Sequence, residues 1–392
     1  MISFEKALSK ILYLADKIDF EEVKLEESYS RVLAHDAISS RDQPPFDASA
    51  MDGYALNKID KLPSKKLSVI GKVAAGNSFD RTVGKGQAVR VFTGAPMPKG
   101  TNSVLIQEDA EELENFITIN QIVEKKDFVR KKGCDYKSGE ILLQKGKILT
   151  SFDIALLASM NFPLLKVTKQ PRVSIISTGD ELVFPGNLPD SNQIVASNTY
   201  GLKALLTKWG ATSHILPIAR DNISSLEKAI DLAIPADLVI TIGGASVGDH
   251  DYVNKVFNKI NVKHSFYKVA MRPGKPILAG KNNNTIFVGL PGNPVSALVC
   301  AQLLLKPLIG KMLGTSELNN IEKKASLQND LPKNGGRKHF MRAFFNNGYL
   351  EVSQKQDSSL LNALQKANAL VIRKPNEPPA KKGDLISYLD LD

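Results

Sequence analysis

From residue 172 onward the sequence alternates between short apolar runs and longer stretches in which apolar residues recur with helical spacing. Loops rich in glycine or polar residues separate them. The runs with the length and composition of strands are 173–176, 212–218, 238–242, 263–270 and 285–289. The stretches that we expect to be helices are 197–209, 224–233 and 295–312. This alternation predicts a parallel sheet with helices on both faces, the doubly wound α/β fold.

The first part of the chain has a different pattern. Residues 3–18 carry apolar side chains along one helix face, and Ser3 can cap that helix. A second helix is expected over residues 151–159. Short apolar runs between them alternate with glycine-rich turns, which predicts a β-rich domain inserted between two helical pieces. The strands expected in that domain are 67–70, 88–92, 103–106 and 116–119.

The end of the chain returns to short strands, at 369–372 and 385–388, spaced by Gly and Pro. This predicts a small β domain that resembles a barrel. We therefore expect an α/β plus β protein of four parts: a discontinuous helical domain (1–45 and 137–168), an inserted β-rich domain (46–136), a doubly wound α/β domain (169–318) and a small C-terminal β-barrel-like domain (319–392).

The charge of the chain limits its class of partner. The formal net charge is +10, but the lysines are scattered and no zinc finger or aromatic-basic RNA motif occurs. We therefore expect no nucleic-acid partner. The positive surplus is explained either by surface solubility or by an anionic substrate.

Cysteine content and hydropathy indicate a cytoplasmic protein. Cys134 and Cys300 are the only cysteines and lie far apart, which excludes a disulfide framework and a cysteine-ligated zinc site. The first residues include an acid, Glu5, and no continuous apolar run, unlike a secretory signal. We take residues 154–165 as the longest weakly polar stretch, which is well short of the roughly 20 residues of a membrane-spanning helix. We expect no membrane partner.

Polar and charged side chains follow each predicted strand of the α/β domain. In open α/β sheets, ligands bind at the carboxyl ends of the strands, so these loops are expected to share one edge. The five loops contain residues 177–182, Asp221 with Asn222, residues 243–251, residues 271–276 and residues 291–296. Turns alone do not require Asp, Glu, Arg and Lys at so many places, which favours a functional site at this edge.

The glycine-rich loop 243–248 leads into a predicted helix. Its backbone N–H groups can hold an anion such as phosphate, and the Ser246 hydroxyl can assist. Gly243, Gly244, Ser246 and Gly248 are therefore candidate binding residues. The alternative is a tight strand-to-helix turn without a ligand.

Several carboxylates are expected near the same edge. Such a cluster is unfavourable unless a cation neutralises it, and oxygen ligands without His or Cys indicate Mg²⁺ rather than zinc. The candidate metal ligands are Asp180, Glu181, Asp221 and Asp251, with Asp249 nearby in sequence. A helix cap is an equally good interpretation of Asp221.

Lys268, Arg272 and Lys275 form a cationic group suited to phosphate or another oxyanion. The turn from Pro291 to Pro294 is rigid and precedes a predicted helix. Its free backbone N–H groups can bind a small oxyanion with help from the Ser296 hydroxyl. Pro294 is equally explained as an ordinary first residue of a helix.

Five long motifs occur in order along the chain: FDASAMDGYA (46–55), FTGAPMPKG (92–100), STGDEL (177–182), GGASVG (243–248) with Asp251, and PGNP (291–294). On these motifs the chain resembles the bacterial molybdopterin molybdenumtransferases and is similar to the C-terminal domain of gephyrin. Long motifs in a fixed order are far more specific than a single glycine pattern.

The resemblance implies insertion of molybdate into adenylylated molybdopterin, with release of AMP and assistance from Mg²⁺. It also implies a homodimer in which the α/β domain of one subunit faces the β domain of the other. The implied catalytic residues are Asp52, Thr93, Glu181, Asp221 and Asp251. The further implied binding residues are Arg130, Asp135, Lys268, Arg272, Pro291, Pro294, Arg342 and Ser358. A turn role for Asp52 and a structural role for Thr93 are the alternatives.

Two rival functions remain open at this point. A pterin adenylyltransferase shares the parallel-sheet domain, but is expected to stand alone without residues 1–165. A non-catalytic scaffold has no need of Asp180, Glu181 and Asp251 at one edge. Further partners that we expect are the adenylyltransferase and the chaperones of molybdoenzymes.

Overall fold

The computed structural model describes residues 1–244 and 252–391. The chain forms two compact units. One, which we call the core unit, consists of Met1–His35, Lys145–Ile154 and Pro163–Asp392. The other, which we call the inserted unit, consists of Asp36–Gln144 and Ala155–Phe162. We describe each by itself.

A six-stranded sheet is the centre of the core unit. Its order is β16 (Thr212–Ile215), β13 (Arg172–Ser177), β17 (Leu238–Ile242), β21 (Thr285–Leu290), β20 (Leu278–Asn282) and β18 (Lys263–Tyr267). The first four strands are parallel, whereas β20 is antiparallel to both of its neighbours. The expectation of a wholly parallel sheet was therefore wrong.

The unexpected strand is the first half of a hairpin. Only Asn283 and Asn284 separate β20 from β21, and Asn283 has a φ of 50°, which Asn tolerates better than most residues. Because β20 reverses the direction, β18 runs the same way as β21. The loops after the five predicted strands therefore still lie at one edge of the sheet.

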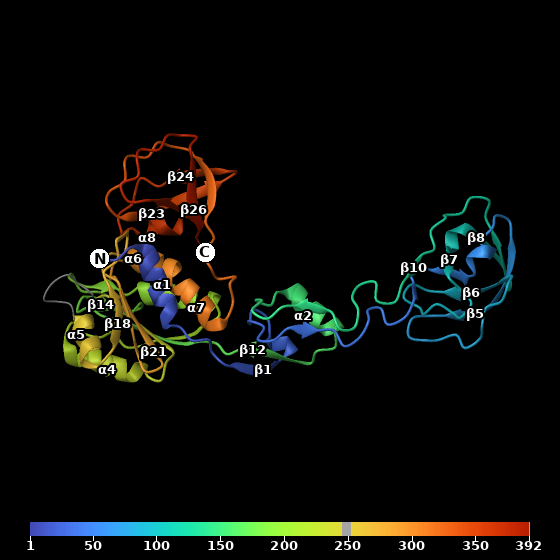
Figure 1. The fold of residues 1–392 in the computed structure, drawn as a ribbon, viewed down its shortest axis with the longest axis horizontal. Helices are drawn as coiled ribbons and strands as arrows, with labels where there is room; N and C mark the ends of the chain where they lie inside the picture. Colours follow the sequence, from blue (N-terminus) through green and yellow to red (C-terminus); the bar gives the residue numbers. More distant parts are fainter. Residues whose placement is uncertain (245–251, 392) are drawn as a thin grey trace. The chain divides into compact units, whose positions relative to one another are not determined.

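Helices cover both faces of this sheet (Figure 1). One face packs on α1 (Phe4–Leu14), α3 (Asn198–Lys208), α6 (Pro294–Cys300) and α7 (Lys306–Leu313). The other packs on α4 (Ile223–Ala233) and α5 (Tyr252–Lys259). In β13, Ile175 belongs to the first core and the next residue, Ile176, to the second, as the alternation of side chains in a strand requires. The doubly wound fold is confirmed.

The N-terminal helix is part of this α/β core. It begins after Ser3, whose hydroxyl accepts a hydrogen bond from the Lys6 N–H at 3.2 Å, and it ends at Leu14. The Lys10 ammonium donates to the Ser265 carbonyl at 2.9 Å. The structure thus differs from the expected discontinuous helical domain, because the first helix of that expected domain packs on the α/β sheet instead.

What remains of that expected domain is mostly strand. β1 (Phe20–Lys24) pairs with β12 (Leu164–Thr168), and β2 (Ala37–Ile38) pairs with β11 (Ile141–Leu143). Only α2 (Ser151–Ser159) is helical, with the bounds expected from the sequence. The exact borders of the four parts stay a prediction.

Helix α6 continues through a π-helical segment, Ala301–Leu305, into α7. The whole stretch, Pro294–Leu313, is long and apolar enough to cross a membrane, so it exceeds the stretch 154–165 that we took as the longest. However, 83% of its apolar window is buried within the structure. It is therefore explained as a core helix.

The C-terminal strands close into a barrel. Strands β23 (Lys338–Asn346), β24 (Tyr349–Val352), β22 (Lys323–Leu327), β26 (Leu385–Asp390) and β25 (Ala369–Arg373) pair in that order, and β25 returns to β23. Val371 points into the barrel core, whereas Leu370 and Ile372 join the core of the α/β domain. The expected small β domain is confirmed, and it packs directly on the α/β domain.

The inserted unit contains a sheet in the order β7 (Ser103–Ile106), β4 (Gly53–Leu56), β6 (Gln87–Val91), β5 (Lys66–Val73), β9 (Phe116–Ile119) and β8 (Ala110–Leu113). Its four expected strands are present, whereas β4 and β8 were not expected. Gly53 is required in β4, because a Cβ there would lie 2.0 Å from the Leu105 carbonyl oxygen. In a shorter pair, β3 (Ala48–Ser49), which lies within the motif 46–55, pairs with β10 (Val129–Arg130).

Candidate functional site

A cavity of about 500 Å³ opens at the carboxyl ends of β13, β17 and β21. This is the edge at which the sequence places polar loops. Its polar lining includes Ser177, Thr178, Glu181, Ser197, Asn198, Asp221, Gly243, Gly244, Asn293 and Ser359. Ser359 comes from the barrel, so two domains of the core unit form the cavity.

Gly243 and Gly244 make a close approach to Thr178. Their φ angles are 90° and 62°, and a Cβ on them would lie 2.6 Å from the Thr178 carbonyl oxygen and 2.7 Å from its hydroxyl. Side chains are therefore excluded from this turn. The Thr178 hydroxyl is buried and has no hydrogen-bond partner among the residues that the structure describes. A buried hydroxyl normally has a partner, so this group is suited to a ligand.

Two of the predicted carboxylates, Glu181 and Asp221, line the cavity. Asp180 does not, and its carboxylate accepts a hydrogen bond from the Asp221 N–H at 3.3 Å. The cap of α4 is Asn222, which accepts from the Ser225 N–H at 2.9 Å. The interpretation of Asp221 as a helix cap is therefore wrong.

The fit to Mg²⁺ depends on the substrate. Within residues 1–244 and 252–391, no three His, Cys, Asp or Glu side chains form a preformed metal site. Mg²⁺ usually binds one or two carboxylates together with substrate phosphates, so Glu181 and Asp221 fit that mode. Ser246, Gly248, Asp249 and Asp251 lie outside the described residues.

One wall of the cavity is apolar and was not expected from the sequence. It consists of Leu182 with Ile194 and Val195, from β14 (Leu182–Val183) and β15 (Ile194–Val195), which pair in parallel. Ile194 is 58% exposed and Val195 41% exposed, so the wall offers apolar surface to a ligand. The sequence feature that could have indicated this wall is the apolar pair Ile194 and Val195, which stands alone within a long polar loop.

The turn from Pro291 to Pro294 lies at the cavity but differs from expectation. Pro291 is buried, and Pro294 is the first residue of α6. The Val295 N–H donates to the Ser358 carbonyl at 3.0 Å, so the protein itself satisfies this backbone group. Ser296 is buried and does not line the cavity, which does not support the expected contact with a ligand.

Ser358, expected as a site residue, reaches the same turn. The Asn293 side chain donates to its hydroxyl at 2.8 Å. The loop that carries Ser358 also receives Arg342, whose guanidinium donates to the Asp357 carbonyl at 3.0 Å. Arg342 is 1% exposed, and its Nε has no partner in the described part of the chain.

The cationic group lies on the loop that follows β18. Lys268 is half-buried with its ammonium over the Tyr267 ring, 4.5 Å from the centroid. Arg272 and Lys275 are exposed and make no hydrogen bond or ion pair through their side chains with other described residues. None of the three lines the 500 Å³ cavity, so they form a separate part of the site.

Arg272 and Arg342 belong to one region of positive potential. Arg272 lies in β19 (Met271–Arg272), paired with His339 of β23. Burial, together with the positive charges of Arg272, Arg337, Arg342 and Arg373, lowers the pKa of His339 to about 4. Burial also lowers the pKa of Arg342; the negative charge of Asp357 opposes this decrease, and Arg272 adds to it. A surplus of close positive charge favours an anion.

The inserted unit holds the remaining predicted residues. One Asp52 oxygen accepts hydrogen bonds from the Thr93 N–H and hydroxyl, and these two bonds, together with the Arg90 charge, lower the Asp52 pKa. Arg90, which was not expected, lies over the Tyr54 ring. Arg130 and Asp135 are exposed on the same unit, Arg130 in β10.

Three family descriptions match this chain in order. Residues 2–161 match the MoeA N-terminal region (domain I and II), residues 174–311 a probable molybdopterin binding domain, and residues 324–391 the MoeA C-terminal region (domain IV). The fold and its site therefore define a multidomain protein built on a molybdopterin-binding α/β domain.

Curated relatives and solved structures agree. The molybdopterin molybdenumtransferase of Haemophilus influenzae is 37% identical, over 99% of this chain and 98% of that protein. That of a Nostoc species is 38% identical, over 81% and 76%. This chain belongs to the molybdopterin molybdenumtransferase family. The crystal structure of a molybdopterin biosynthesis moea protein from Pyrococcus horikoshii has 29% identity and a TM-score of 0.86, and the match covers 100% of this chain and 99% of that one.

Proposed function

We propose that this protein inserts molybdate into adenylylated molybdopterin, with hydrolysis and release of AMP, and so produces the molybdenum cofactor. The observation that carries the proposal is the cavity at the strand ends, which combines a Thr178 hydroxyl with no partner among the described residues, a glycine turn and two carboxylates. The names of the curated relatives support the same reaction.

The cavity suits the phosphate-bearing part of this substrate. The Thr178 hydroxyl can donate to a phosphate oxygen, and the absence of side chains at Gly243 and Gly244 lets the substrate approach the backbone. The apolar wall of Ile194 and Val195 can pack against a flat ring. Glu181 and Asp221 would hold Mg²⁺, which would neutralise charge on the pyrophosphate.

Molybdate is a dianion, and the region around Arg272 suits it. Among the described residues, Arg272 and Lys275 have no carboxylate partner, and the Nε of buried Arg342 makes no hydrogen bond. Charge-assisted hydrogen bonds from guanidinium groups to an oxyanion are short and strong. We assign molybdate to these cations.

The reaction requires attack on phosphorus. An oxygen of water or molybdate bonds to the AMP phosphorus, and the bond from that phosphorus to the bridging pyrophosphate oxygen breaks. Glu181 and Asp221 face the cavity, where they can orient the attacking group and, when that group is water, accept its proton. Positioning and charge neutralisation supply most of the acceleration in such transfers.

We further propose that the protein acts as a homodimer in the cytoplasm, without a nucleic-acid or membrane partner. In this arrangement Asp52, Thr93, Arg130 and Asp135 of one copy complete the site of the other. Two features of Asp52 support this: it is exposed, and one carboxylate oxygen makes no hydrogen bond within the described part of the chain. The adenylyltransferase and molybdoenzyme chaperones are the partners that would supply substrate and accept product.

Two incubations test the proposal against the adenylyltransferase reaction. In one, the purified protein receives adenylylated molybdopterin, molybdate and Mg²⁺, and in the other molybdopterin, ATP and Mg²⁺. Mass spectrometry of the bound pterin is expected to show a molybdenum-containing product in the first and no adenylylation in the second. Net adenylylation without molybdenum insertion would reverse the assignment.

A further inference from the structure

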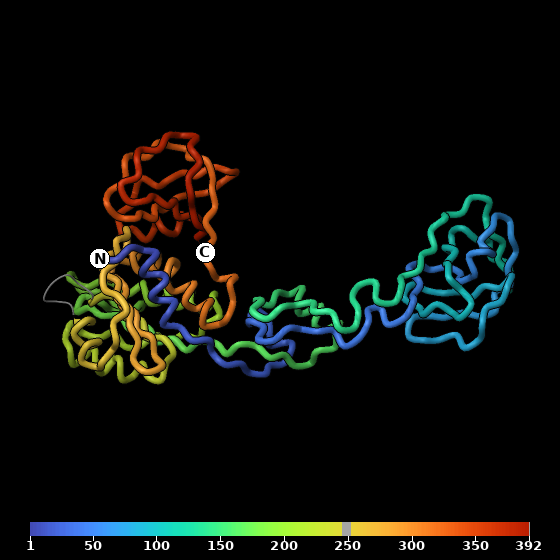
Figure 2. The backbone as a smooth tube through the Cα atoms, in the orientation of Figure 1, coloured from blue at the N-terminus to red at the C-terminus, as the bar shows by residue number. Residues whose placement is uncertain are grey.

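The loop that carries Lys268 and Arg272 is bordered on one side by the first residues of the chain. The Ile2 N–H donates to the Lys268 carbonyl at 3.2 Å, and the Ala270 N–H donates to the Ile2 carbonyl at 2.8 Å. Ile2 thus forms a parallel bridge with Val269. Figure 2 shows the N-terminus, in blue, beside this segment.

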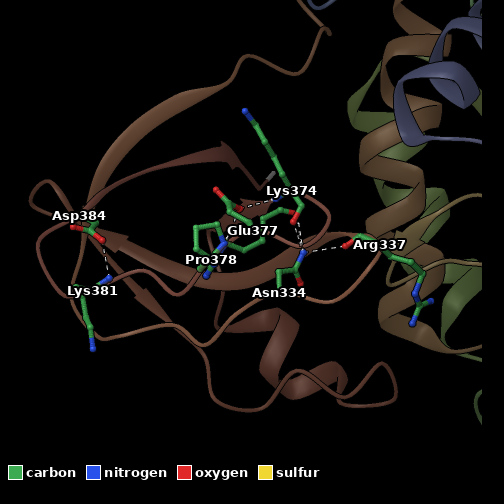
Figure 3. Close-up of polar contacts among 8 residues, drawn as sticks. Asn334, Arg337, Lys374, Glu377, Pro378, Lys381 and Asp384 are labelled. Atoms are coloured by element: carbon green, nitrogen blue, oxygen red, sulfur yellow. Dashed lines mark hydrogen bonds and ion pairs between the residues drawn. The ribbon is translucent and has the colours of Figure 1, made fainter.

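The barrel borders the same loop on its other side. Strand β19 pairs with the start of β23, and the Lys338 N–H donates to the Ala270 carbonyl at 3.1 Å. The Arg337 guanidinium donates to the Met271 carbonyl at 3.3 Å. Asn334 fixes the backbone before it, because its side-chain amide donates to the carbonyls of Arg337 at 3.0 Å and Lys374 at 2.7 Å (Figure 3).

A side-chain contact joins the two borders. The Lys338 ammonium lies 2.8 Å from the Glu5 carboxylate, and the Lys338 side chain is only 17% exposed. The same ammonium lies 5.0 Å from the centroid of the Phe4 ring, which packs edge-on against Phe340 at 4.9 Å. The N-terminal segment, the cationic loop and β23 therefore form one connected structure.

The loop requires such support. Lys268 has a φ of 65°, in the left-handed region that non-glycine residues rarely adopt. The loop also presents exposed Arg272 near the buried Arg342, and repulsion between these two positive charges opposes its position. Backbone strain of this kind persists where the surroundings determine the conformation, and it is common at functional sites.

We infer that Ile2 is a positioning residue for oxyanion binding: its two backbone hydrogen bonds hold Lys268 and, through Ala270, Arg272 in the orientation that receives molybdate. The inference rests on the proposed function, because it presumes that these cations bind molybdate. It adds that residues 1–5, which contribute no charge to the cavity, set the affinity of the cationic loop.

The test compares two substitutions at one position in the full-length protein. Ile2→Pro removes the N–H that donates to Lys268, whereas Ile2→Ala keeps it and removes only side-chain packing. Titration calorimetry with molybdate alone is expected to show dissociation constants about three- to tenfold higher for Ile2→Pro, the range of one net hydrogen bond, and within about twofold of wild type for Ile2→Ala.

A second readout separates positioning from general stability. In steady-state assays, Ile2→Pro is expected to raise the KM for molybdate and to leave the KM for adenylylated molybdopterin unchanged. If Ile2→Pro does not fold, Glu5→Gln replaces it. Loss of the contact with Lys338 is expected to raise the molybdate dissociation constant, whereas loss of a negative charge without any change of loop position would lower it.

Arg272→Ala separates failure of the positioning role of Ile2 from failure of the assigned molybdate site. If Arg272→Ala weakens molybdate binding but Ile2→Pro does not, the positioning role of Ile2 is overturned and the proposed function stands. Equal weakening by Ile2→Ala and Ile2→Pro would also overturn it, since packing would then be the cause. If Arg272→Ala binds molybdate like the wild type, the assignment of the oxyanion site fails as well.

Discussion

The carboxylate of Asp52 accepts two hydrogen bonds from Thr93, one from its backbone N–H at 2.7 Å and one from its hydroxyl at 2.8 Å. Both bonds use the same oxygen, Oδ1. The pair fixes the orientation of the carboxylate and lowers its pKa, so Asp52 is charged at neutral pH. The two residues come from separate motifs, and these hydrogen bonds join them in the folded inserted unit.

Loss of the Asp52 charge should slow catalysis without unfolding the inserted unit. We expect Asp52→Asn to reduce the rate of AMP release by about 100-fold, the usual scale for a group that acts on the reacting atoms. Asp80→Asn, an exposed acid of the same unit, is the control and should match the wild type. Normal AMP release by Asp52→Asn, measured by chromatography, would remove Asp52 from the site.

Glu181 should determine the response to Mg²⁺. Because Glu181→Gln removes one of the two described carboxylates of the cavity, we expect the Mg²⁺ concentration for half-maximal activity to rise about tenfold. Asp231→Asn, an exposed acid on α4, provides the control. The assignment is contradicted if the two variants show the same Mg²⁺ dependence.

The charge and the shape of Arg272 should both matter for molybdate. We expect Arg272→Ala to weaken molybdate binding at least tenfold, about the effect of one charge-assisted hydrogen bond, and Arg272→Lys to recover only part of it. The exposed Lys263, at the end of β18 opposite the cationic loop, is a suitable control for loss of one positive charge. Equal weakening by Lys263→Ala and Arg272→Ala would indicate a diffuse electrostatic effect instead.

The lowered pKa of His339 should make the folded protein less stable in acid. Its pKa in the folded protein is about 4, below the usual 6.5, so the unfolded chain binds more protons between these values. The resulting stability is fully present above pH 6.5 and is lost as the pH falls toward 4, by up to about 3 kcal/mol. We expect His339→Gln to flatten the decrease in denaturant stability between pH 6.5 and pH 4, and an unchanged slope would contradict this.

Gly274 belongs to the cationic loop and packs closely against Cys300 of α6. Its φ is 99°, and a Cβ would lie 2.1 Å from the Cys300 sulfur. Gly383→Ala is the matched control, because Gly383 has a φ of 90° but nothing within 4 Å of its ideal Cβ. We expect Gly383→Ala to cost about 1 kcal/mol of unfolding free energy and Gly274→Ala at least about 2 kcal/mol more. Equal losses of unfolding free energy would show that the loop can move away from Cys300 without further loss of stability.

Much of the fold follows from local pattern. Strand β17, Leu238–Ile242, is predicted with its observed bounds because a run of buried β-branched residues has few alternatives. Strand β20 is missed because the sequence Leu278–Asn282 contains glycine, lysine and asparagine and has little strand character. The spacing of α1 predicts an amphipathic helix, but it does not determine which surface that helix covers.

In the candidate site, too, some residues follow from the local sequence pattern and others only from tertiary packing. Glu181, Asp221 and the glycine pair are predicted because loops after parallel strands meet at one edge. The burial of the Thr178 hydroxyl without a partner in the described part of the chain and the contribution of Ser359 depend on tertiary packing, which leaves no local pattern. The stabilising contacts of Ile2 likewise join residues more than 260 positions apart, so only the folded chain reveals them.

The most direct test of the central claim measures AMP and protein-bound molybdenum in the same reaction. Purified protein is mixed with adenylylated molybdopterin and Mg²⁺, with and without molybdate. AMP is then quantified by chromatography and molybdenum in the bound pterin by mass spectrometry. We expect equal amounts of released AMP and inserted molybdenum, both dependent on molybdate. Release of AMP at the same rate without any molybdenum in the product would contradict it.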